Sequence, residues 1–265
     1  MAPTDGATAA PRAVDIALDE ARIHAEWHRE PVPGKPVLVF LHDGLGCTRT
    51  MRRFPALLGE ALGLGAFVYD RWGYGQSDRR ETFPLFFMED EAERLPRILD
   101  AAGIEDCCLV GHSDGGTIAL LHAAENTSRV RATATMAAHI FLDRLTQAEL
   151  ARHQKMIDDD DIPEFMVRFH GDRGPHVLWC WTSMHRDPSY QGWDISGRIG
   201  AIAGPLMSIQ GADDAYGTPE QISGIKAAVP HAEAMMIPGL GHFPHVEDPE
   251  RTTGIVADFL HPHCG

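Results

Sequence analysis

Apolar residues follow two different spacings in the first part of this chain. In residues 14–18 and again in residues 23–27, apolar side chains alternate with polar or small ones, which is typical of half-buried strands. Continuous apolar runs at 36–41, 66–69 and 107–110 instead indicate strands buried on both faces of a sheet. The pattern predicts an opening hairpin followed by a mainly parallel sheet.

Helical spacing separates these runs and continues to the end of the chain. The further predicted elements are, in chain order, helices at 51–62, 87–102 and 115–125, a strand at 130–136, a strand at 205–210, a helix at 218–228, a strand at 233–237 and a helix at 248–260. Strands and helices that alternate in this way favour an α/β fold. We expect a mostly parallel twisted sheet of about eight strands with helices on both faces.

The alternation stops between residues 139 and 200, where helical but no strand spacing is found. This segment is predicted to be a helical lid inserted into a core made of residues 13–138 and 201–265. Residues 1–12 are rich in Ala, Pro and Thr and contain no apolar run, so they are expected to form a disordered tail rather than a signal peptide.

Composition excludes several classes of function. The chain has 23 Lys and Arg against 38 Asp and Glu, a net charge of −15 with neutral His. Such an acidic protein repels phosphate backbones and anionic headgroups, so neither nucleic acid nor a membrane is an expected partner. No run approaches the ~18 apolar residues of a membrane span. The five cysteines have neither the spacing of a metal site nor that of a disulfide framework, so we expect a cytoplasmic protein without a metal. Whether the protein forms a homo-oligomer stays open.

The segment Gly111-His112-Ser113-Asp114-Gly115 lies between a predicted buried strand and a predicted helix. In this Gly-x-Ser-x-Gly pattern the glycines permit a sharp turn that exposes the serine hydroxyl at the carboxyl edge of the sheet. The helix that follows directs its free N–H groups toward charge that develops near the serine. Ser113 is therefore the candidate nucleophile.

A serine nucleophile needs a general base, and the base needs an orienting acid. Both follow predicted strands in a suitable order: an acid after strand 205–210 and His242 in a Gly-rich turn after strand 233–237. Asp214 is the preferred acid, and its neighbour Asp213 is the alternative. His242 is the candidate base.

A tetrahedral oxyanion needs two backbone N–H donors, each worth about 3 kcal/mol. The N–H of Asp114, directly after the serine, is expected to supply one. The loop at 42–46 is expected to supply the other, from either Gly44 or Leu45. Asp43 lies in the same loop and is a candidate substrate contact.

These motifs together resemble the α/β-hydrolase family over roughly residues 14–262. The loop at 42–46 resembles the family's His-Gly-x-Gly oxyanion loop, with Asp43 in place of the usual glycine. Residues 70–77 resemble its Asp-x-x-Gly-x-Gly-x-Ser segment, and residues 239–242 resemble its catalytic histidine turn. The resemblance implies a hydrolase of ester, amide, lactone or thioester bonds that acts on a small molecule without cofactor or metal.

The expected function is a serine hydrolase that cleaves a small carboxylic ester, lactone or thioester through an acyl-enzyme. Two alternatives stay open. One is different chemistry on the same fold, such as carbon–carbon bond hydrolysis, a perhydrolase reaction or cofactor-free oxygenation. The other is a ligand receptor without catalysis.

Substrate contacts are expected from tryptophans of the inserted segment as well. Trp179 and Trp181 either pack this segment on the core or line an acyl or aryl pocket. The Ser-Asp-Gly-Gly turn is similar to that of valacyclovir-hydrolase-like enzymes, which implies a pairing of Asp114 with a substrate amine. A surface position at the helix N-terminus is the alternative for Asp114. With Asp43 and Asp114 near the serine, we expect neutral or cationic esters to be preferred over carboxylate-bearing ones.

Overall fold

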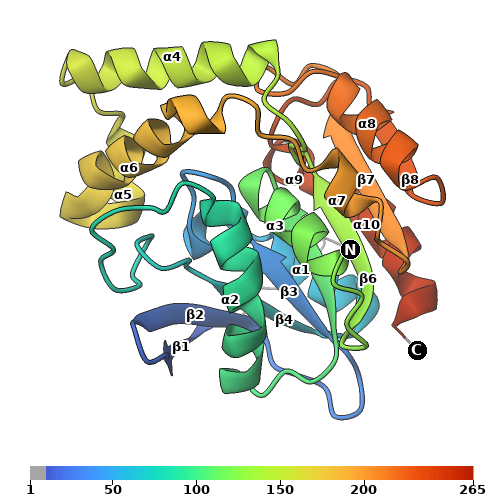
Figure 1. The fold of residues 1–265 in the computed structure, drawn as a ribbon. Helices are drawn as coiled ribbons and strands as arrows, with labels where there is room; N and C mark the ends of the chain where they lie inside the picture. The colour runs from blue at the N-terminus through green and yellow to red at the C-terminus, as the bar shows by residue number, and fades with distance from the viewer. Residues whose placement is uncertain (1–9, 265) are drawn as a thin grey trace, which may run out of the picture.

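The computed structural model describes residues 10–264, which contain one eight-stranded sheet (Figure 1). The strand order is β1-β2-β4-β3-β5-β6-β7-β8; β2 is antiparallel to β1 and β4, and the other neighbours are parallel. The strands are β1 (Arg12–Ala17), β2 (Arg22–Arg29), β3 (Val37–Leu41), β4 (Gly65–Tyr69), β5 (Cys107–His112), β6 (Val130–Met136), β7 (Leu206–Gly211) and β8 (Glu233–Ile237). The predicted α/β class and mostly parallel sheet are confirmed.

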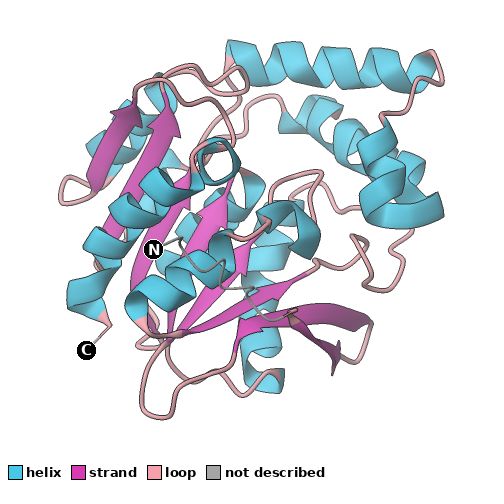
Figure 2. Cartoon of the chain, turned by 180° about the vertical axis from the view of Figure 1, so that it is seen from behind, coloured by secondary structure: helices cyan, strands magenta, loops and turns pink. Residues whose placement is uncertain are grey.

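Helices cover both faces of the sheet, as Figure 2 shows from behind. The α-helices are α1 (Phe54–Leu62), α2 (Phe87–Ala101), α3 (Asp114–Ala123), α4 (Arg144–Asp158), α5 (Glu164–His170), α6 (Gly174–Arg186), α7 (Ser196–Ile199), α8 (Glu220–Ala228), α9 (Pro244–Glu247) and α10 (Pro249–Leu260). The 3-10 turns are η1 (Thr48–Met51), η2 (Gly171–Arg173), η3 (Pro188–Tyr190) and η4 (His261–His263).

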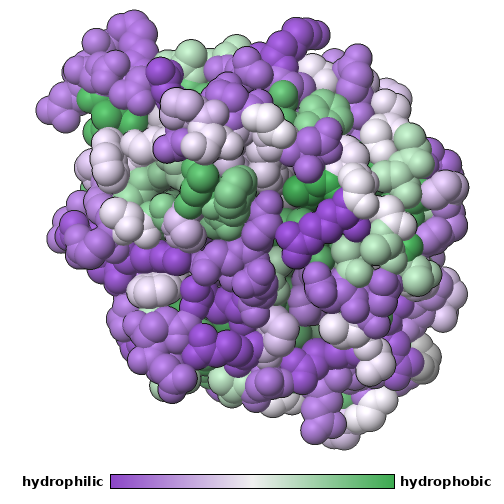
Figure 3. Space-filling model, viewed as in Figure 1, coloured by the Kyte–Doolittle hydropathy of each residue, from purple (hydrophilic) through white to green (hydrophobic). Residues whose placement is uncertain are grey.

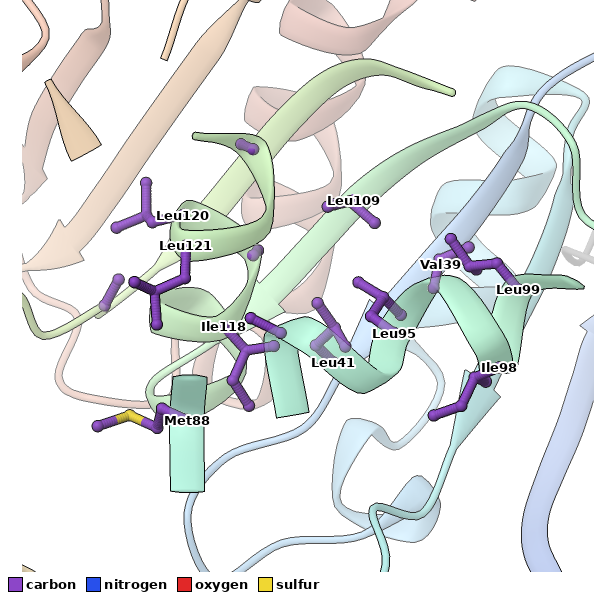
Figure 4. Packing of buried hydrophobic residues seen from close by; sticks show 14 of the residues in the cluster. Val39, Leu41, Met88, Leu95, Ile98, Leu99, Leu109, Ile118, Leu120 and Leu121 are labelled. Atoms are coloured by element: carbon purple, nitrogen blue, oxygen red, sulfur yellow. The ribbon is translucent and has the colours of Figure 1, made fainter. Parts of the chain in front are cut away.

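The continuous apolar runs become central strands because successive side chains point to opposite faces. In β3, Val39 and Leu41 belong to the core cluster that includes residues of α2 and α3. Leu38 and Phe40 belong to the cluster on the other face, which includes residues of α1 and α10. Figure 4 shows the first cluster, in which leucines and isoleucines of α2 and α3 surround Val39 and Leu41. This packing holds the carboxyl end of β5, where the candidate nucleophile follows.

The chain between β6 and β7 forms α4 to α7. In Figures 1 and 2, α4, α5 and α6 lie together beyond the end of the sheet toward which the central parallel strands run. Ile195 and Ile199, in contrast, are buried in the main core cluster, and α7 contacts α3 and α8. Part of this segment therefore belongs to the packing of the core, and a lid with the bounds 139–200 stays a prediction.

The predicted tail over 1–12 falls largely outside the described residues, which exclude 1–9. Its last residue, Arg12, is already part of β1, where it pairs with Trp27 of β2 and its guanidinium bonds the Glu30 carboxylate. None of the helices in the described part of the chain is long and apolar enough to cross a membrane.

Candidate active site

Ser113 occupies a strained turn between β5 and α3. Its φ of 53° lies in the left-handed region that non-glycine residues seldom adopt. The turn is possible because Gly115 has no side chain: a Cβ there would lie 2.1 Å from the carbonyl oxygen of Leu41. The strand, the turn and the helix thus follow the predicted pattern and direct Ser113 to the carboxyl edge of the sheet.

Ser113, His242 and Asp214 form one chain of hydrogen bonds. The Ser113 hydroxyl donates to Nε2 of His242 at 3.1 Å. The Nδ1–H of His242 donates to both carboxylate oxygens of Asp214, at 2.9 and 3.0 Å. Asp214 also accepts from the backbone N–H groups of Tyr216 and Gly217, which fix its orientation. A hydroxyl, an imidazole and a carboxylate in this order can activate a serine as a nucleophile.

Burial and the hydrogen bond between them shift the pKa values of His242 and Asp214, the two partners of Ser113. It lowers the pKa of His242 below its ordinary value, although the hydrogen bond and charge of Asp214 act in the opposite direction. Burial alone would raise the pKa of Asp214, but the His242 hydrogen bond and charge outweigh it, so this pKa is lowered. Near neutral pH the pair is therefore a neutral imidazole beside a carboxylate, as a general base requires.

Two further histidines border His242, and neither was predicted from the sequence. Nε2–H of His112 donates to the backbone carbonyl of His242 at 2.8 Å, which holds the main chain of the base. The rings of His139 and Tyr216 lie 5.8 and 4.5 Å from the His242 ring, measured between centroids. The position of His112, directly before the serine, was the only sequence signal that pointed to it.

The predicted oxyanion donors lie around Ser113. As first residue of α3, Asp114 has an N–H without a partner inside the helix. The N–H groups of Gly44 and Leu45 donate to no protein acceptor among the described residues. The buried Arg71 guanidinium holds their loop by donating to the carbonyls of His42 and Asp43. Two sets of free N–H groups are thus available to a developing oxyanion.

The two carboxylates near the serine are both engaged. Asp114 is buried, and its Oδ2 accepts a hydrogen bond of 2.7 Å from Nε1 of Trp181 on α6. Asp43 accepts a hydrogen bond of 3.0 Å from the Thr50 hydroxyl. Burial alone would raise the pKa of Asp43, but the neighbouring His112 imidazole outweighs it and lowers this pKa. Both side chains are therefore held in place by hydrogen-bond donors of the protein.

A cavity of about 330 Å³ opens beside Ser113 and His242. The predicted residues Asp43, Gly44, Leu45 and Trp181 line it, as do the unpredicted Tyr216, Phe243 and Val246. These last three residues lie close to Asp214 or His242 in the sequence. Their proximity to the predicted acid and base could have identified them as cavity residues.

Trp179, a predicted substrate contact, does not reach this cavity. Its side chain is 47% exposed and stacks on His176. Residues two apart on a helix point to nearly opposite sides, so Trp179 and Trp181 of α6 cannot both face the same cavity. No group of His, Cys, Asp and Glu within residues 10–264 is arranged to hold a metal ion.

Comparison with known proteins gives the same fold over nearly the whole chain. Residues 38–254 match the sequence profile of the alpha/beta hydrolase family. The sn-1-specific diacylglycerol lipase of Mus musculus is 23% identical over 254 residues, covering 85% of this chain and 81% of the lipase. The proline iminopeptidase of Heyndrickxia coagulans is 21% identical, covering 92% of this chain and 97% of the peptidase. A bacterial membrane phospholipase A has a similar structure, with a TM-score of 0.78 at 19% identity and coverages of 95% and 86%.

Proposed function

Because the chain belongs to the alpha/beta hydrolase family, we propose that it is a serine hydrolase that cleaves a small carboxylic ester through an acyl-enzyme. The observation that carries this proposal is the unbroken chain of hydrogen bonds from Ser113 through His242 to Asp214 at the wall of a cavity. In the proposed roles Ser113 is the nucleophile, His242 the general base and Asp214 the orienting acid.

The reaction proposed for these groups has two halves. Nε2 of His242 takes the Ser113 proton while Oγ bonds to the ester carbonyl carbon, and the carbonyl oxygen becomes an oxyanion. The N–H of Asp114 and that of Gly44 or Leu45 would stabilise this oxyanion. When the tetrahedral intermediate collapses, the carbon–oxygen bond to the alcohol breaks and His242 returns the proton to it. Water, activated by the same imidazole, then releases the acid and regenerates Ser113.

The type of scissile bond is the finer part of the proposal. A free small-molecule ester is favoured because the cavity of about 330 Å³ is lined largely by apolar side chains, such as Leu45, Phe243 and Val246. Trp181 would contact the bound acyl or aryl group. Lactones and thioesters undergo the same acyl transfer and stay within the proposal. The cytoplasm is the proposed location, since the five cysteines are all free in the described chain.

The proposal is tested with an acyl-chain series of p-nitrophenyl esters, run beside lactones, amino-acid esters and amino-acid arylamides. We expect turnover of the p-nitrophenyl esters with an optimum in chain length, and its complete loss in the Ser113→Ala variant. The arylamides address the amide alternative that the proline iminopeptidase relative raises. A kcat/KM higher for arylamides than for every ester would replace esterase by amidase, and no turnover of any substrate would favour the ligand-receptor alternative.

A further inference from the structure

Three arginines surround one aromatic ring at the edge of the cavity. The guanidinium carbons of Arg49, Arg52 and Arg168 lie 5.4, 5.9 and 5.5 Å from the ring centroid of Phe169. Arg49 lies within η1 and Arg52 directly follows it, whereas Arg168 and Phe169 belong to α5, so two segments distant in sequence form the cluster. All three arginines are exposed and so remain accessible to a ligand. We call these three residues the arginine cluster.

The arginine cluster has no acidic partner. Within residues 10–264 none of its members forms an ion pair, and the single polar contact of their side chains is donation from Arg49 to the carbonyl of Arg168 at 2.9 Å. The other cations nearby are neutralised: Arg53 pairs with Glu250, and Arg152 pairs with Glu149.

Like charges gathered in this way repel each other, and an anion would relieve the repulsion. The absence of a counter-charge is unexpected for a chain with 38 acidic residues against 23 basic ones. Hydrophilic side chains do cover most of the face shown in Figure 3, which leaves hydrophobic groups in small separate patches. Acidic residues are plentiful in the sequence, and none of those described pairs with the arginine cluster.

Arg52 is the member of the arginine cluster that lines the cavity of the nucleophile, and the Phe169 ring connects it to Arg49 and Arg168 outside that lining. Arg52 and Phe169 line the cavity together with Ser113 and His242. Other parts of its wall are apolar, formed by Leu178 of α6 together with Phe165, Phe243 and Val246. A ligand that fits this wall has a neutral reacting group at Ser113, an apolar body, and a negative charge at the arginine cluster.

We propose that the substrate is an anionic amphiphile: an ester whose apolar body fills the cavity and whose distal carboxylate or phosphate binds Arg52 and Arg168. This inference rests on the proposed hydrolase function and specifies its substrate class. It reverses the expectation that carboxylate-bearing esters are disfavoured. That expectation followed from the net charge and from Asp43 and Asp114. These two carboxylates lie near Ser113, where they accept hydrogen bonds from Thr50 and Trp181, whereas the distal anion would lie at Arg52. Because screening weakens interactions beyond a Debye length of about 8 Å, an anion at Arg52 interacts most strongly with the arginines next to it.

The test compares matched substrates that differ in one charge. Mono-p-nitrophenyl esters of adipic, suberic and sebacic acid carry a free distal carboxylate, and their methyl esters are neutral controls of equal length. We expect kcat/KM to be about 5- to 10-fold higher for the acid of optimal length, through a lower KM. The preference is expected to shrink as salt is raised from about 0.1 M to about 1 M, where the Debye length falls from ~10 to ~3 Å.

Variants connect this preference to the arginine cluster. Arg52→Gln and Arg168→Gln are expected to lower kcat/KM for the acid much more than for its methyl ester, and so to remove most of the preference for the acid. Arg53→Gln is the matched control, because it removes the same charge from the adjacent, acid-paired residue. The inference is overturned if Arg52→Gln and Arg168→Gln alter acids and methyl esters equally, or if Arg53→Gln has the same effect as they do.

Binding without turnover separates this inference from the proposed function. In the Ser113→Ala protein, calorimetry with sebacate and with its monomethyl ester measures recognition alone. Tighter binding of sebacate that is lost in Ser113→Ala/Arg52→Gln supports the anion site even if no ester is hydrolysed. Equal binding of the two ligands overturns it even if esters are hydrolysed. A phosphate or carboxylate on a lipid surface is the other source of such an anion. Sedimentation with phosphatidylglycerol but not phosphatidylcholine vesicles, without any preference for sebacate, would therefore also overturn the proposal.

Discussion

Asp213 and Asp214 are adjacent carboxylates with different surroundings. Asp214 is bonded to His242 and to two backbone N–H groups, whereas the Asp213 side chain is exposed and its backbone N–H bonds the carbonyl of Leu240. Asp214→Asn would place a neutral amide against Nδ1 of His242 and disturb its tautomer. We expect kcat to fall by about 10³- to 10⁴-fold. Asp213→Asn removes a negative charge from the neighbouring residue and should change kcat by less than about twofold. If steady-state kinetics show the larger loss of kcat in Asp213→Asn, the role of the acid would be reassigned to Asp213.

The pH profile of the reaction depends on His242. Only neutral imidazole accepts the Ser113 proton, so kcat/KM should rise with pH as His242 loses its proton. Because burial lowers the pKa of His242, the midpoint is expected below the ordinary histidine value of about 6.5. The measurement is kcat/KM for a neutral ester across the acid and neutral range. A midpoint above that value, or a profile without any acid limb, would contradict the proposed base.

A single site residue could be predicted from the sequence where the local chain pattern determines its place in the fold. Ser113, His242 and Asp214 follow predicted strand ends, and the carboxyl ends of parallel strands meet at one edge of the sheet. The arginine cluster had no comparable signal, because it forms only when α5 packs beside η1. Trp179 was assigned to the substrate although helix geometry alone separates it from Trp181.

At the scale of elements, the turn from β5 to α3 is the most constrained part of the fold. A Cβ on Gly115 would lie 2.1 Å from a backbone oxygen of β3, and backbone cannot move aside at low cost. Gly115→Ala is expected to lower the free energy of unfolding by about 2–4 kcal/mol. Chemical denaturation measures this quantity, and activity should fall as the nucleophile is displaced.

Gly254 provides the control for that substitution. It lies in the middle of α10, is exposed, and has open space around the position of a Cβ. Gly254→Ala should therefore raise the free energy of unfolding by about 0.5–1 kcal/mol through helix propensity alone. If both alanine variants were stabilised, the close approach of α3 to β3 would be wrong.

Element types were predictable because apolar spacing reports burial, whereas element ends depend on local backbone geometry. The helix predicted at 51–62 is divided into η1 and α1, since Arg52 has a φ of 54° that no helix accepts. The strand predicted at 107–110 extends to His112, because Gly111 and His112 still pair with β6. Pairing of this kind cannot be read from composition, because glycine and histidine are not typical strand residues.

For the whole molecule, buried histidines predict sensitivity to acid. Burial is the largest cause that lowers the pKa of seven of them: His42, His122, His153, His170, His185, His242 and His245. When the folded pKa lies below the unfolded one, the unfolded chain binds more protons, so stability falls as pH drops below about 6.5. Each such histidine contributes up to ~1.4 kcal/mol per pH unit until its folded pKa is reached.

Thermal unfolding at several pH values checks this expectation. The Tm should be constant above neutrality and decline steadily from about pH 6.5 downward. For His153, burial lowers the pKa to about 4, so His153→Gln should make the decline shallower. His261→Gln, in the exposed turn η4, is the control and should leave the slope unchanged. A Tm that rises on acidification would show that these side chains are not buried in the neutral form.

Net charge is a property of the whole chain and does not fix the local field at its cavity. The value of −15 describes the whole chain, whereas Arg52, which has no acidic partner among the described residues, lines the cavity and is linked to Arg49 and Arg168 through the Phe169 ring. Screening confines each charge to its neighbourhood, so the sum over the chain and the field at one opening can have opposite signs. The proposed preference for an anionic ligand therefore rests on the packed structure and not on the net charge.

Labelling with a fluorophosphonate tests most directly whether Ser113 is a nucleophile activated by His242. The reagent phosphonylates an activated serine and releases fluoride, and mass spectrometry locates the adduct. We predict one adduct on Ser113, none in Ser113→Ala, and labelling slowed at least about 100-fold in His242→Ala. Hydrolysis of esters by a protein that carries no adduct on Ser113, or an adduct on another residue that abolishes hydrolysis, would contradict the account.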